Sequence, residues 1–307
     1  MADTKLNKLL YTVSYSREFI VGGFASSTAC LFTNPLDVVK TRFQLQGELQ
    51  TRGAYVVKYK NIFDAFMKIF HHEGMSGLQK GLIPALSFQI VMNSTRLGIY
   101  QTIINTGITG NGKGQQVFST LLAAGAFSGC CWALLGTSFY LVKVQMQSAA
   151  NPSIAVGYQH KHSGLIAGLK AAHVSSGGLF QGLSSALART TVGSATQLAT
   201  FTTSKQIIGS FGVIKSDFGI VCASSLCSSI AVTFTMTPFD VVATRMFNQK
   251  HGLYYNGWWD CTLKIFKHEG IYGFYKGTFA HFFSYRSPHY LNTYNSGSVQ
   301  EMVFLRF

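Results

Sequence analysis

Three isolated arginines lie in segments that otherwise carry very little charge. Arg96 occurs within MNSTRLGIY, Arg189 within LARTTVGSATQLA and Arg286 within FSYRSPHY. An arginine in an apolar helix is energetically costly, so it indicates a functional site. Its planar guanidinium binds a carboxylate through two parallel hydrogen bonds. Two or three such arginines facing one cavity would suit a small dianion. The alternative is that each side chain extends to a lipid headgroup.

A second set of charges recurs in two nearly identical strings. NPLDVVKTRFQLQ begins at Asn34, and TPFDVVATRMFNQ begins at Thr237. Each string holds a proline, which removes a backbone hydrogen bond and kinks a helix. In the first string, Asp37 and Lys40 are three residues apart and therefore share a helix face. Charges at this depth are expected to face a polar interior. An acid from one copy could pair there with a base from the next, forming a plug that can open.

Long apolar segments must position these charges. The 307 residues are 47% hydrophobic and only 12% charged, about half the charged share of soluble domains. Three runs contain no charged residue: 19–36, 114–142 and 218–239. A membrane span needs roughly 20 apolar residues. We therefore interpret these runs as membrane helices. The alternative, buried helices of a large soluble enzyme, fits their regular spacing less well.

Internal repeats organise the chain. YKNIFDAFMKIFHHEG from Tyr59 and YNGWWDCTLKIFKHEG from Tyr255 align without a gap. A weaker middle copy has SFYLVKVQMQ from Ser138 and GLFQG in place of GLQKG. A period near 100 residues predicts three units, 1–110, 111–210 and 211–307.

The pattern of each unit predicts a long apolar helix, a polar loop, a short amphipathic helix, a glycine turn and a second helix. The long helices are expected over 16–45, 116–147 and 216–248, and the second helices over 82–105, 183–206 and 278–300. The predicted fold is an all-α membrane protein with six transmembrane helices in three pseudo-symmetric pairs. Small residues on the long helices would let the helices approach closely.

Charge and motifs exclude several other functions. The net charge is +14, but the basic residues are scattered and form no dense cluster of the nucleic-acid-binding kind. They suit anionic lipid and an acidic solute instead. The six cysteines show no CxxC pair and no metal-ligand spacing. The N-terminus lacks the uninterrupted apolar core of a secretory signal. No P-loop and no Ser-His-Asp order occurs, so we expect no enzymatic activity, no metal and no cofactor.

The repeated strings resemble the motif of the mitochondrial carrier family, solute carrier family 25. That motif reads Pro, any residue, acid, two of any kind, base, three of any kind, Gln, once per repeat. The first repeat fits fully, with Pro35, Asp37, Lys40 and Gln44. The second repeat has lost the proline and the acid, with Ser138, Tyr140, Lys143 and Gln147. The third has lost the base and the glutamine, with Pro238, Asp240, Ala243 and Phe247. The resemblance covers nearly the whole chain.

The resemblance implies a multi-pass carrier of the mitochondrial inner membrane that works by alternating access, with helix kinks at Pro35, Ser138 and Pro238. It also implies short helices on the matrix side and a ring of ion pairs between repeats that closes that side. The pairs carried over are Asp240 with Lys143, Lys40 with Tyr140, and Asp37 with Ala243. Only the first of these is a complete ion pair. A hydrated pair is worth roughly 0–1 kcal/mol, so we expect a weak matrix gate.

The resemblance also implies substrate contacts one or two turns into the second helix of each repeat. These are expected at Phe88, Asn93, Arg96, Arg189, Thr190, Ser284, Tyr285 and Arg286. Arg189-Thr190 is similar to the pair found in carriers of keto acids and dicarboxylates. RLGIY, QLA and SPHY are similar to the oxaloacetate and dicarboxylate branch, which includes the member 34/35-type carriers. Phe88 stands where that branch commonly has an arginine.

These features predict an antiporter of small carboxylates such as oxaloacetate, with inorganic anions as further candidates. The resemblance implies a small anionic solute and membrane lipid, cardiolipin in particular, as partners, and a monomer. The alternative is a carrier-fold protein with a leak, uncoupling or lipid-binding scaffold role and no specific solute. The degenerate gate motifs favour that alternative, whereas the retained arginines favour transport.

Overall fold

The computed structural model describes residues 28, 30–50, 55–105, 118–175, 178–211, 216–250 and 254–278, and its regular elements there are all helices. The first helix covers residues 30–45. It is followed by α2 (Ile62–Leu78), α3 (Leu82–Asn105), α4 (Phe118–Ser148), α5 (Leu165–Val174), α6 (Leu183–Phe211), α7 (Asp217–Asn248), α8 (Trp258–Glu269) and the 3-10 helix η1 (Ile271–Tyr275). The predicted all-α class is therefore confirmed. Apart from its first residue, the helix predicted over 278–300 lies outside the described residues.

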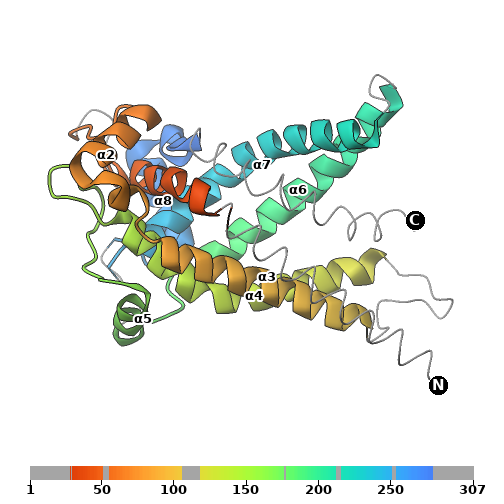
Figure 1. Cartoon of the computed structure of the whole chain (residues 1–307), viewed down its shortest axis with the longest axis horizontal. Helices are drawn as coiled ribbons and strands as arrows, with labels where there is room; N and C mark the ends of the chain where they lie inside the picture. The colour runs from red at the N-terminus through yellow and green to blue at the C-terminus, as the bar shows by residue number, and fades with distance from the viewer. Residues whose placement is uncertain are drawn as a thin grey trace.

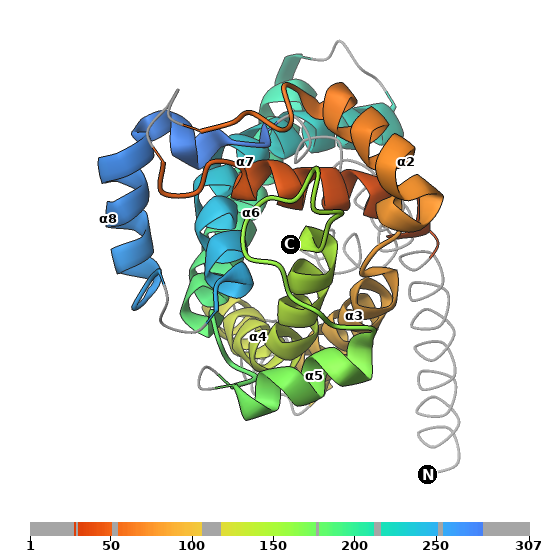
Figure 2. The same ribbon diagram turned by 90° about the vertical axis from the view of Figure 1, so that its left-hand side faces the viewer.

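The long helices form pairs, and the short helices gather at one end. In Figure 1, α3 runs alongside α4, and α6 runs alongside α7, as their contacts also show. The two pairs meet near α2, α5 and α8 and separate toward the opposite end of the view. Figure 2 shows the molecule from the end that carries the short helices, and α2, α5 and α8 lie at separate positions around its edge. The arrangement agrees with one short helix per repeat.

Local sequence signals fix the ends of the short helices. Asn61 caps α2 because its side-chain oxygen accepts a hydrogen bond from the Asp64 backbone nitrogen at 2.8 Å. Gly74 interrupts α2 with a φ of 68°, and Gly270 ends α8 with the same φ of 68°. Both glycines close the repeated Glu-Gly string. The same local sequence therefore produces the same left-handed turn, which glycine adopts without strain.

A turn glycine follows the short helices of each repeat, just before the second long helix of that repeat begins. Gly81, Gly182 and Gly277 all have positive φ, between 72° and 82°. A Cβ atom on Gly81 would lie only 2.9 Å from the Gln147 Cγ atom. The second helix of repeat 1 can therefore begin directly against the long helix of repeat 2. Gly182 lies in the same way against Phe247, and Gly277 lies near Gln44.

Three clusters of buried apolar residues fasten the short helices to the long ones. The first includes Val38, Tyr59 and Ile69, and the third includes Val241, Tyr255 and Ile265. Tyr59 and Tyr255 begin the two repeated strings, so they hold equivalent places. The middle cluster includes Leu141, Ala172, Ala243 and Phe247. Burial of these side chains is the main stabilising contribution at this end.

The outer faces of several long helices are apolar. Large exposed side chains include Phe32, Ile83, Ile90, Leu135, Phe218 and Phe234. Apolar area of this kind is unusual in water and is typical of contact with lipid or a partner. Within the described residues, one helix is long and apolar enough to span a bilayer by length and composition, over Phe218–Asn248. Six spans therefore remain a prediction.

Candidate functional site

Two ion pairs join the repeats where the first helix, α4 and α7 converge. The Lys143 Nζ atom lies 2.8 Å from the Asp37 Oδ2 atom, and both side chains are largely buried. Lys40 forms an ion pair with Asp240, whose side chain is fully buried. Arg189 of α6 contacts the second oxygen of Asp240, with 3.2 Å between its Nη1 atom and Oδ1. These five side chains carry three positive and two negative charges, so their sum is positive.

The predicted pairing around this ring is wrong. Asp37 lies against Lys143 instead of Ala243, and Lys40 lies against Asp240 instead of Tyr140. Each base therefore meets the acid of the preceding repeat, whereas the sequence interpretation paired it with the following one. Two ion pairs are complete, so the expectation of a single complete pair is wrong, and the weak gate inferred from it loses that support.

The ring of contacts between repeats has a third sector, between repeats 2 and 3, where the motif positions are Tyr140 and Ala243. An aromatic cluster occupies this sector. The Tyr140 ring lies 5.1 Å from the Phe247 ring and 5.2 Å from the Phe88 ring, measured between centroids. Ala243 is fully buried in the same cluster. The guanidinium carbon of Arg189 lies 4.8 Å from the Tyr140 ring centroid, within the range of a cation–π interaction. Apolar packing and Arg189 thus replace the ion pair that this sector lacks.

The two motif glutamines brace neighbouring repeats. Gln44 donates to the Asp240 Oδ2 atom at 3.4 Å and accepts a hydrogen bond from the Thr244 hydroxyl at 2.7 Å. Gln147 donates to Asn34 at 3.0 Å and accepts from the Thr41 hydroxyl at 3.1 Å. All four bonds cross from one repeat to another, so both glutamines help to hold the ring closed. Phe247 fills the third glutamine position.

The predicted kink residues lie inside continuous helices. Pro35 is within the first helix, Ser138 within α4 and Pro238 within α7. The Ser138 hydroxyl donates to the Leu179 carbonyl at 3.2 Å. Ser138 therefore ties α4 to the turn that precedes α6.

The predicted substrate contacts are only partly within the described structure. Arg189 lies at the ring, and Phe88 is buried against Tyr140. The Thr190 hydroxyl donates to the Leu187 carbonyl of its own helix at 3.0 Å. Asn93 and Arg96 belong to α3, but their side chains lie outside the described part, as do Ser284, Tyr285 and Arg286 entirely. The structure thus places one predicted anion-binding arginine against Asp240 in the ring of ion pairs.

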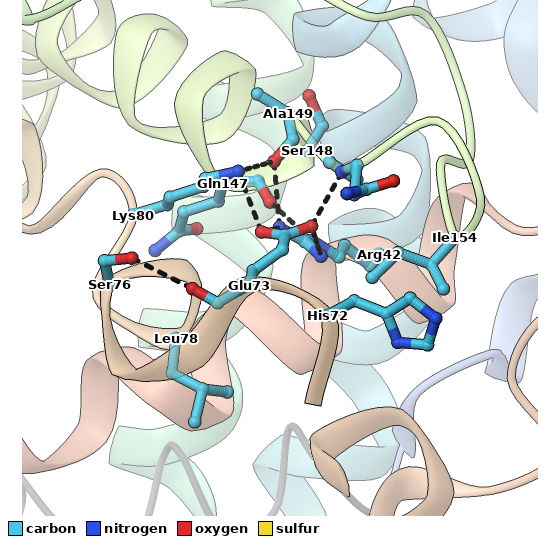
Figure 3. A network of polar contacts seen from close by, with 12 residues as sticks. Arg42, His72, Glu73, Ser76, Leu78, Lys80, Gln147, Ser148, Ala149 and Ile154 are labelled. Atoms are coloured by element: carbon cyan, nitrogen blue, oxygen red, sulfur yellow. Dashed lines mark hydrogen bonds and ion pairs between the residues drawn. The ribbon is translucent and has the colours of Figure 1, made fainter. Parts of the chain in front are cut away.

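A second layer of charges, which the sequence interpretation missed, lies closer to the short helices. Arg42 donates two parallel hydrogen bonds to Glu73, at 2.9 and 2.8 Å (Figure 3). Lys80 lies 2.8 Å from the same carboxylate. Arg42 also reaches repeat 2, donating to the carbonyls of Gln147 at 3.2 Å and Ala149 at 2.8 Å. We call these three charged side chains a trio (Arg42, Glu73 and Lys80). The trio caps the C-terminal end of α4.

Repeat 3 caps the first helix of repeat 1 in the same way. Arg245 forms a two-point ion pair with Glu269, and Lys276 contacts the same carboxylate. Arg245 donates to the Gln44 carbonyl at 3.3 Å, and Lys276 donates to the Gln46 carbonyl at 2.8 Å. The signal for both trios was present in the repeats, which share Thr-Arg, Glu-Gly and Lys-Gly.

Both carboxylates of these trios are held ionised. Burial alone would raise the pKa of Glu73, but hydrogen bonds from Arg42, Lys80 and the Asn151 backbone lower it to about 2. Burial likewise opposes ionisation of Glu269, and Arg245 and Lys276 outweigh it, so the pKa of Glu269 is lowered. Each carboxylate therefore stabilises the fold above a pH of about 4.5, and this contribution is lost as the pH falls toward the folded pKa.

Replacing Glu73 with glutamine should lower the free energy of unfolding by about 3 kcal/mol, because the charge of the fully buried Arg42 loses its carboxylate. Asp64→Asn on the same helix is the matched control. Its partner Lys68 is four residues away, and the two side chains are 26% (Asp64) and 35% (Lys68) exposed. The control should change stability by less than about 0.5 kcal/mol. Denaturant unfolding of the purified protein measures both, and equal effects would contradict the assigned role of the trio.

The family described as mitochondrial carrier protein matches three stretches, residues 11–109, 114–211 and 215–293. Solute carrier family 25 member 35 of Homo sapiens is 41% identical over 274 residues, 87% of this chain and 91% of that protein. The mitochondrial oxaloacetate transport protein of Schizosaccharomyces pombe is 37% identical over 294 residues, 94% and 91% of the two chains. The mitochondrial citrate transporter E of Aspergillus niger is 37% identical over 268 residues, 86% of each chain.

Proposed function

Because the chain belongs to the mitochondrial carrier family, we propose that it transports small carboxylates across the mitochondrial inner membrane by alternating access. The members of this family are solute transporters. The proposed substrate is a keto acid or dicarboxylate such as oxaloacetate, with inorganic anions as further candidates. Two relatives are named as transporters of oxaloacetate and of citrate, and these names support a small carboxylate as the substrate. We further propose repeats at 1–110, 111–210 and 211–307, an antiport mode, a monomer and contact with cardiolipin.

The position of Arg189 is the observation that carries this proposal. Its guanidinium contacts one oxygen of Asp240, while Lys40 contacts the other. The local sum of charges is positive, which favours an incoming anion. A substrate carboxylate that binds Arg189 in two-point fashion would compete with Asp240 for the guanidinium. Substrate binding would thereby weaken the link between α6 and α7 and favour opening of the gate.

The remaining contacts of the proposed site would come from α3, from Thr190 of α6 and from residues 284–286. Arg96 and Arg286 would supply further positive charge, with Asn93, Thr190, Ser284 and Tyr285 as hydrogen-bonding side chains. Phe88, which packs on Tyr140, would form the apolar floor of the site. The exposed apolar side chains of α3, α4 and α7 support placement of these helices in lipid.

The second candidate is a leak or lipid-binding scaffold role. One observation favours it, namely that Tyr140 and Ala243 provide neither acid nor base in the third sector. A scaffold needs no selective carboxylate site, whereas a carrier needs one that depends on Arg189. Selective binding therefore distinguishes the two functions.

Thermal unfolding of the detergent-purified protein tests the proposal. Oxaloacetate and related dicarboxylates should raise the unfolding midpoint in a saturable way, because a ligand that binds only the folded state stabilises it. Adenine nucleotides at equal concentration and ionic strength serve as the control and should leave the midpoint unchanged. A nucleotide response without a carboxylate response would refute a carboxylate carrier. The absence of any response would favour the scaffold.

A further inference from the structure

The loops that follow the long helices differ between the repeats. In repeat 1, the Gln46 side chain donates to the Tyr59 carbonyl at 2.9 Å and accepts a hydrogen bond from the Tyr59 nitrogen at 2.6 Å. Gln249 and Tyr255 form the same pair of bonds in repeat 3, at 3.1 and 2.9 Å. Each pair fastens the loop to its own repeat. Ala149 holds the equivalent position in repeat 2, and its methyl group can neither donate nor accept a hydrogen bond. The loop of repeat 2 therefore lacks this fastening.

The loop of repeat 2 crosses the end of the bundle instead. We call residues 150–162, between α4 and α5, the strap. Figure 1 shows it at the end that carries the short helices, and Figure 2 shows it in front of the long helices there. It covers the equivalent residue at the end of each first helix of a repeat, in chain order Leu45, Ser148 and Asn248. A path along the axis of the bundle would therefore have to pass the strap.

The strap fits closely over these three residues. A Cβ atom on Gly157 would lie 3.1 Å from the Leu45 Cβ atom and 2.8 Å from the Asn248 Nδ2 atom. Such distances leave no room for a side chain, so the backbone itself covers the helix ends. The Gln159 side chain donates to the Ser148 carbonyl at 3.3 Å. One segment thus contacts all three repeats.

The attachment of the strap to repeat 1 is extensive. Ile154 and Val156 are buried in the cluster that contains Tyr59. The Tyr59 hydroxyl donates to the Ile154 carbonyl at 2.7 Å, and the Asn151 nitrogen donates to Glu73 at 2.8 Å. Burial of the two apolar side chains gives this attachment its strength. We therefore expect the strap to remain with repeat 1 when this end of the bundle rearranges.

The attachment to repeat 3 is weaker and includes an unsatisfied donor. Among the described residues, the strap and repeat 3 share one hydrogen bond, in which the His160 Nε2 atom lies 2.8 Å from the Asn248 carbonyl oxygen. Asn248 is 1% exposed. Its side-chain oxygen accepts from the Ser148 hydroxyl at 2.6 Å, but its Nδ2 atom has no hydrogen-bond partner in the described part of the chain. A buried donor without a partner costs free energy that hydration would recover. The strap is therefore easiest to release at Asn248.

We propose that the strap is a lid over the proposed matrix end of the carrier, which stays attached to repeat 1 and is released from Asn248 whenever this end opens. The inference rests on the proposed alternating access, in which the repeats move apart to let the solute leave. The ring of ion pairs is one barrier. The strap is a second barrier outside it, because positions 45, 148 and 248 follow the ring positions toward the ends of the helices. Release exchanges the contacts with Asn248 for water and keeps the buried attachment to repeat 1.

Labelling of a thiol beneath the strap tests this proposal without any solute. Asn248→Cys places the thiol, and N-ethylmaleimide labels it in the detergent-purified full-length protein. Peptide mass spectrometry reads the label at position 248 and at the native Cys261. Cys261 is fully buried in the apolar cluster of repeat 3, so its labelling reports unfolding.

Adding His160→Ala should speed labelling at position 248 about fivefold, because the lost hydrogen bond corresponds to ~1 kcal/mol. Gly157→Ala should act in the same direction, since its φ of 66° disfavours alanine and the added Cβ atom has no room. His173→Ala on α5 is the matched control, because His173 is exposed and lies outside the strap.

The control should label at the rate of the protein that carries Asn248→Cys alone, and Cys261 should label slowly in every variant. Equal rates at position 248 for His160→Ala and His173→Ala would overturn the proposal. Labelling of Cys261 as fast as position 248 would overturn it as well, because the repeat would then unfold as a whole.

A reversible cross-link tests whether the strap must move during transport. In a background with the six native cysteines replaced by alanine, His160→Cys and Asn248→Cys are joined by a short methanethiosulfonate cross-linker. This link fastens the lid, so oxaloacetate exchange in proteoliposomes should fall at least about tenfold and return after reduction with dithiothreitol. Lys58→Cys with Ser153→Cys is the control pair, because Lys58 of repeat 1 already donates to the Ser153 carbonyl at 2.9 Å. Linking that pair should leave the exchange rate unchanged.

Failure of the lid and failure of the proposed transport give different results. Full exchange with a completely formed link between positions 160 and 248 would overturn the lid. No exchange by the wild type would refute carboxylate transport instead, and the labelling rates at position 248 would then decide the lid on their own.

Discussion

Replacing Asp240 with asparagine should destabilise the closed end of the bundle by about 3–5 kcal/mol, the scale for removing one member of a buried charge cluster. Asp240 is fully buried, and its two oxygens contact Lys40 and Arg189 from two other repeats. Asparagine keeps the shape but removes the negative charge that both cations contact. Denaturant unfolding of the ligand-free protein measures the effect.

Asp260→Asn is the matched control for this prediction. Asp260 lies in the same repeat, and its partner Lys264 is four residues away, with both side chains about a third exposed. The control should cost less than about 0.5 kcal/mol. Adding Lys40→Gln to Asp240→Asn should recover part of the loss, because one of the two cations is then gone. A loss no larger than that of Asp260→Asn would show that Asp240 does not hold the repeats together.

Replacing Arg189 with lysine should lower the rate of carboxylate uptake more than tenfold. Lysine keeps the charge but cannot bind a carboxylate through two parallel hydrogen bonds. Loss of such a desolvated contact costs roughly 2–5 kcal/mol. Arg189→Ala should abolish uptake, and so should Arg96→Ala if Arg96 faces the same cavity. Initial rates in proteoliposomes measure these effects.

Lys170→Gln on α5 controls for a general effect of lost positive charge. Its side chain is exposed on the short helix α5 and is not among the ring residues, so uptake should stay at the wild-type rate. Comparing Arg189→Lys with Arg189→Ala separates charge from geometry. Wild-type uptake by both Arg189 variants would move the substrate site away from the gate.

The sequence predicts the helices well because their ends carry local signals. The second helix of repeat 1 was expected over 82–105 and is found at Leu82–Asn105. The long helix of repeat 3 was expected over 216–248 and is found at Asp217–Asn248. A glycine turn marks the first of these starts and a serine cap the second. Such signals act within a few residues, so one sequence suffices to recognise them.

The direction of pairing around the ring could not be predicted in this way. Lys40 and Arg42 are two residues apart and so lie about 200° apart around the helix. Lys40 reaches repeat 3, and Arg42 reaches repeat 2. Which neighbour lies on which side depends on how the three repeats are arranged in space. Motif spacing contains no information on that arrangement, and the predicted pairs were consequently reversed.

This reversal changes what Ala243 does. The pairing inferred from sequence suggested that a lysine at position 243 would meet Asp37 and strengthen the gate. In the structure, Ala243 is buried among Leu141, Ala186 and Phe247, and Asp37 is already paired with Lys143. Ala243→Lys would place a charge in an apolar cluster beside Tyr140, so we expect it to destabilise the fold.

The two charged trios were missed for another reason. The three members of each trio lie in three separate strings of the sequence.

Uptake of radiolabelled oxaloacetate into liposomes that contain the purified protein tests the central claim most directly. The account predicts saturable uptake into vesicles preloaded with unlabelled oxaloacetate, a rate reduced more than tenfold by Arg189→Lys, and no uptake into protein-free vesicles. Uptake no faster than in protein-free vesicles, or equally fast for wild type and Arg189→Ala, would contradict it.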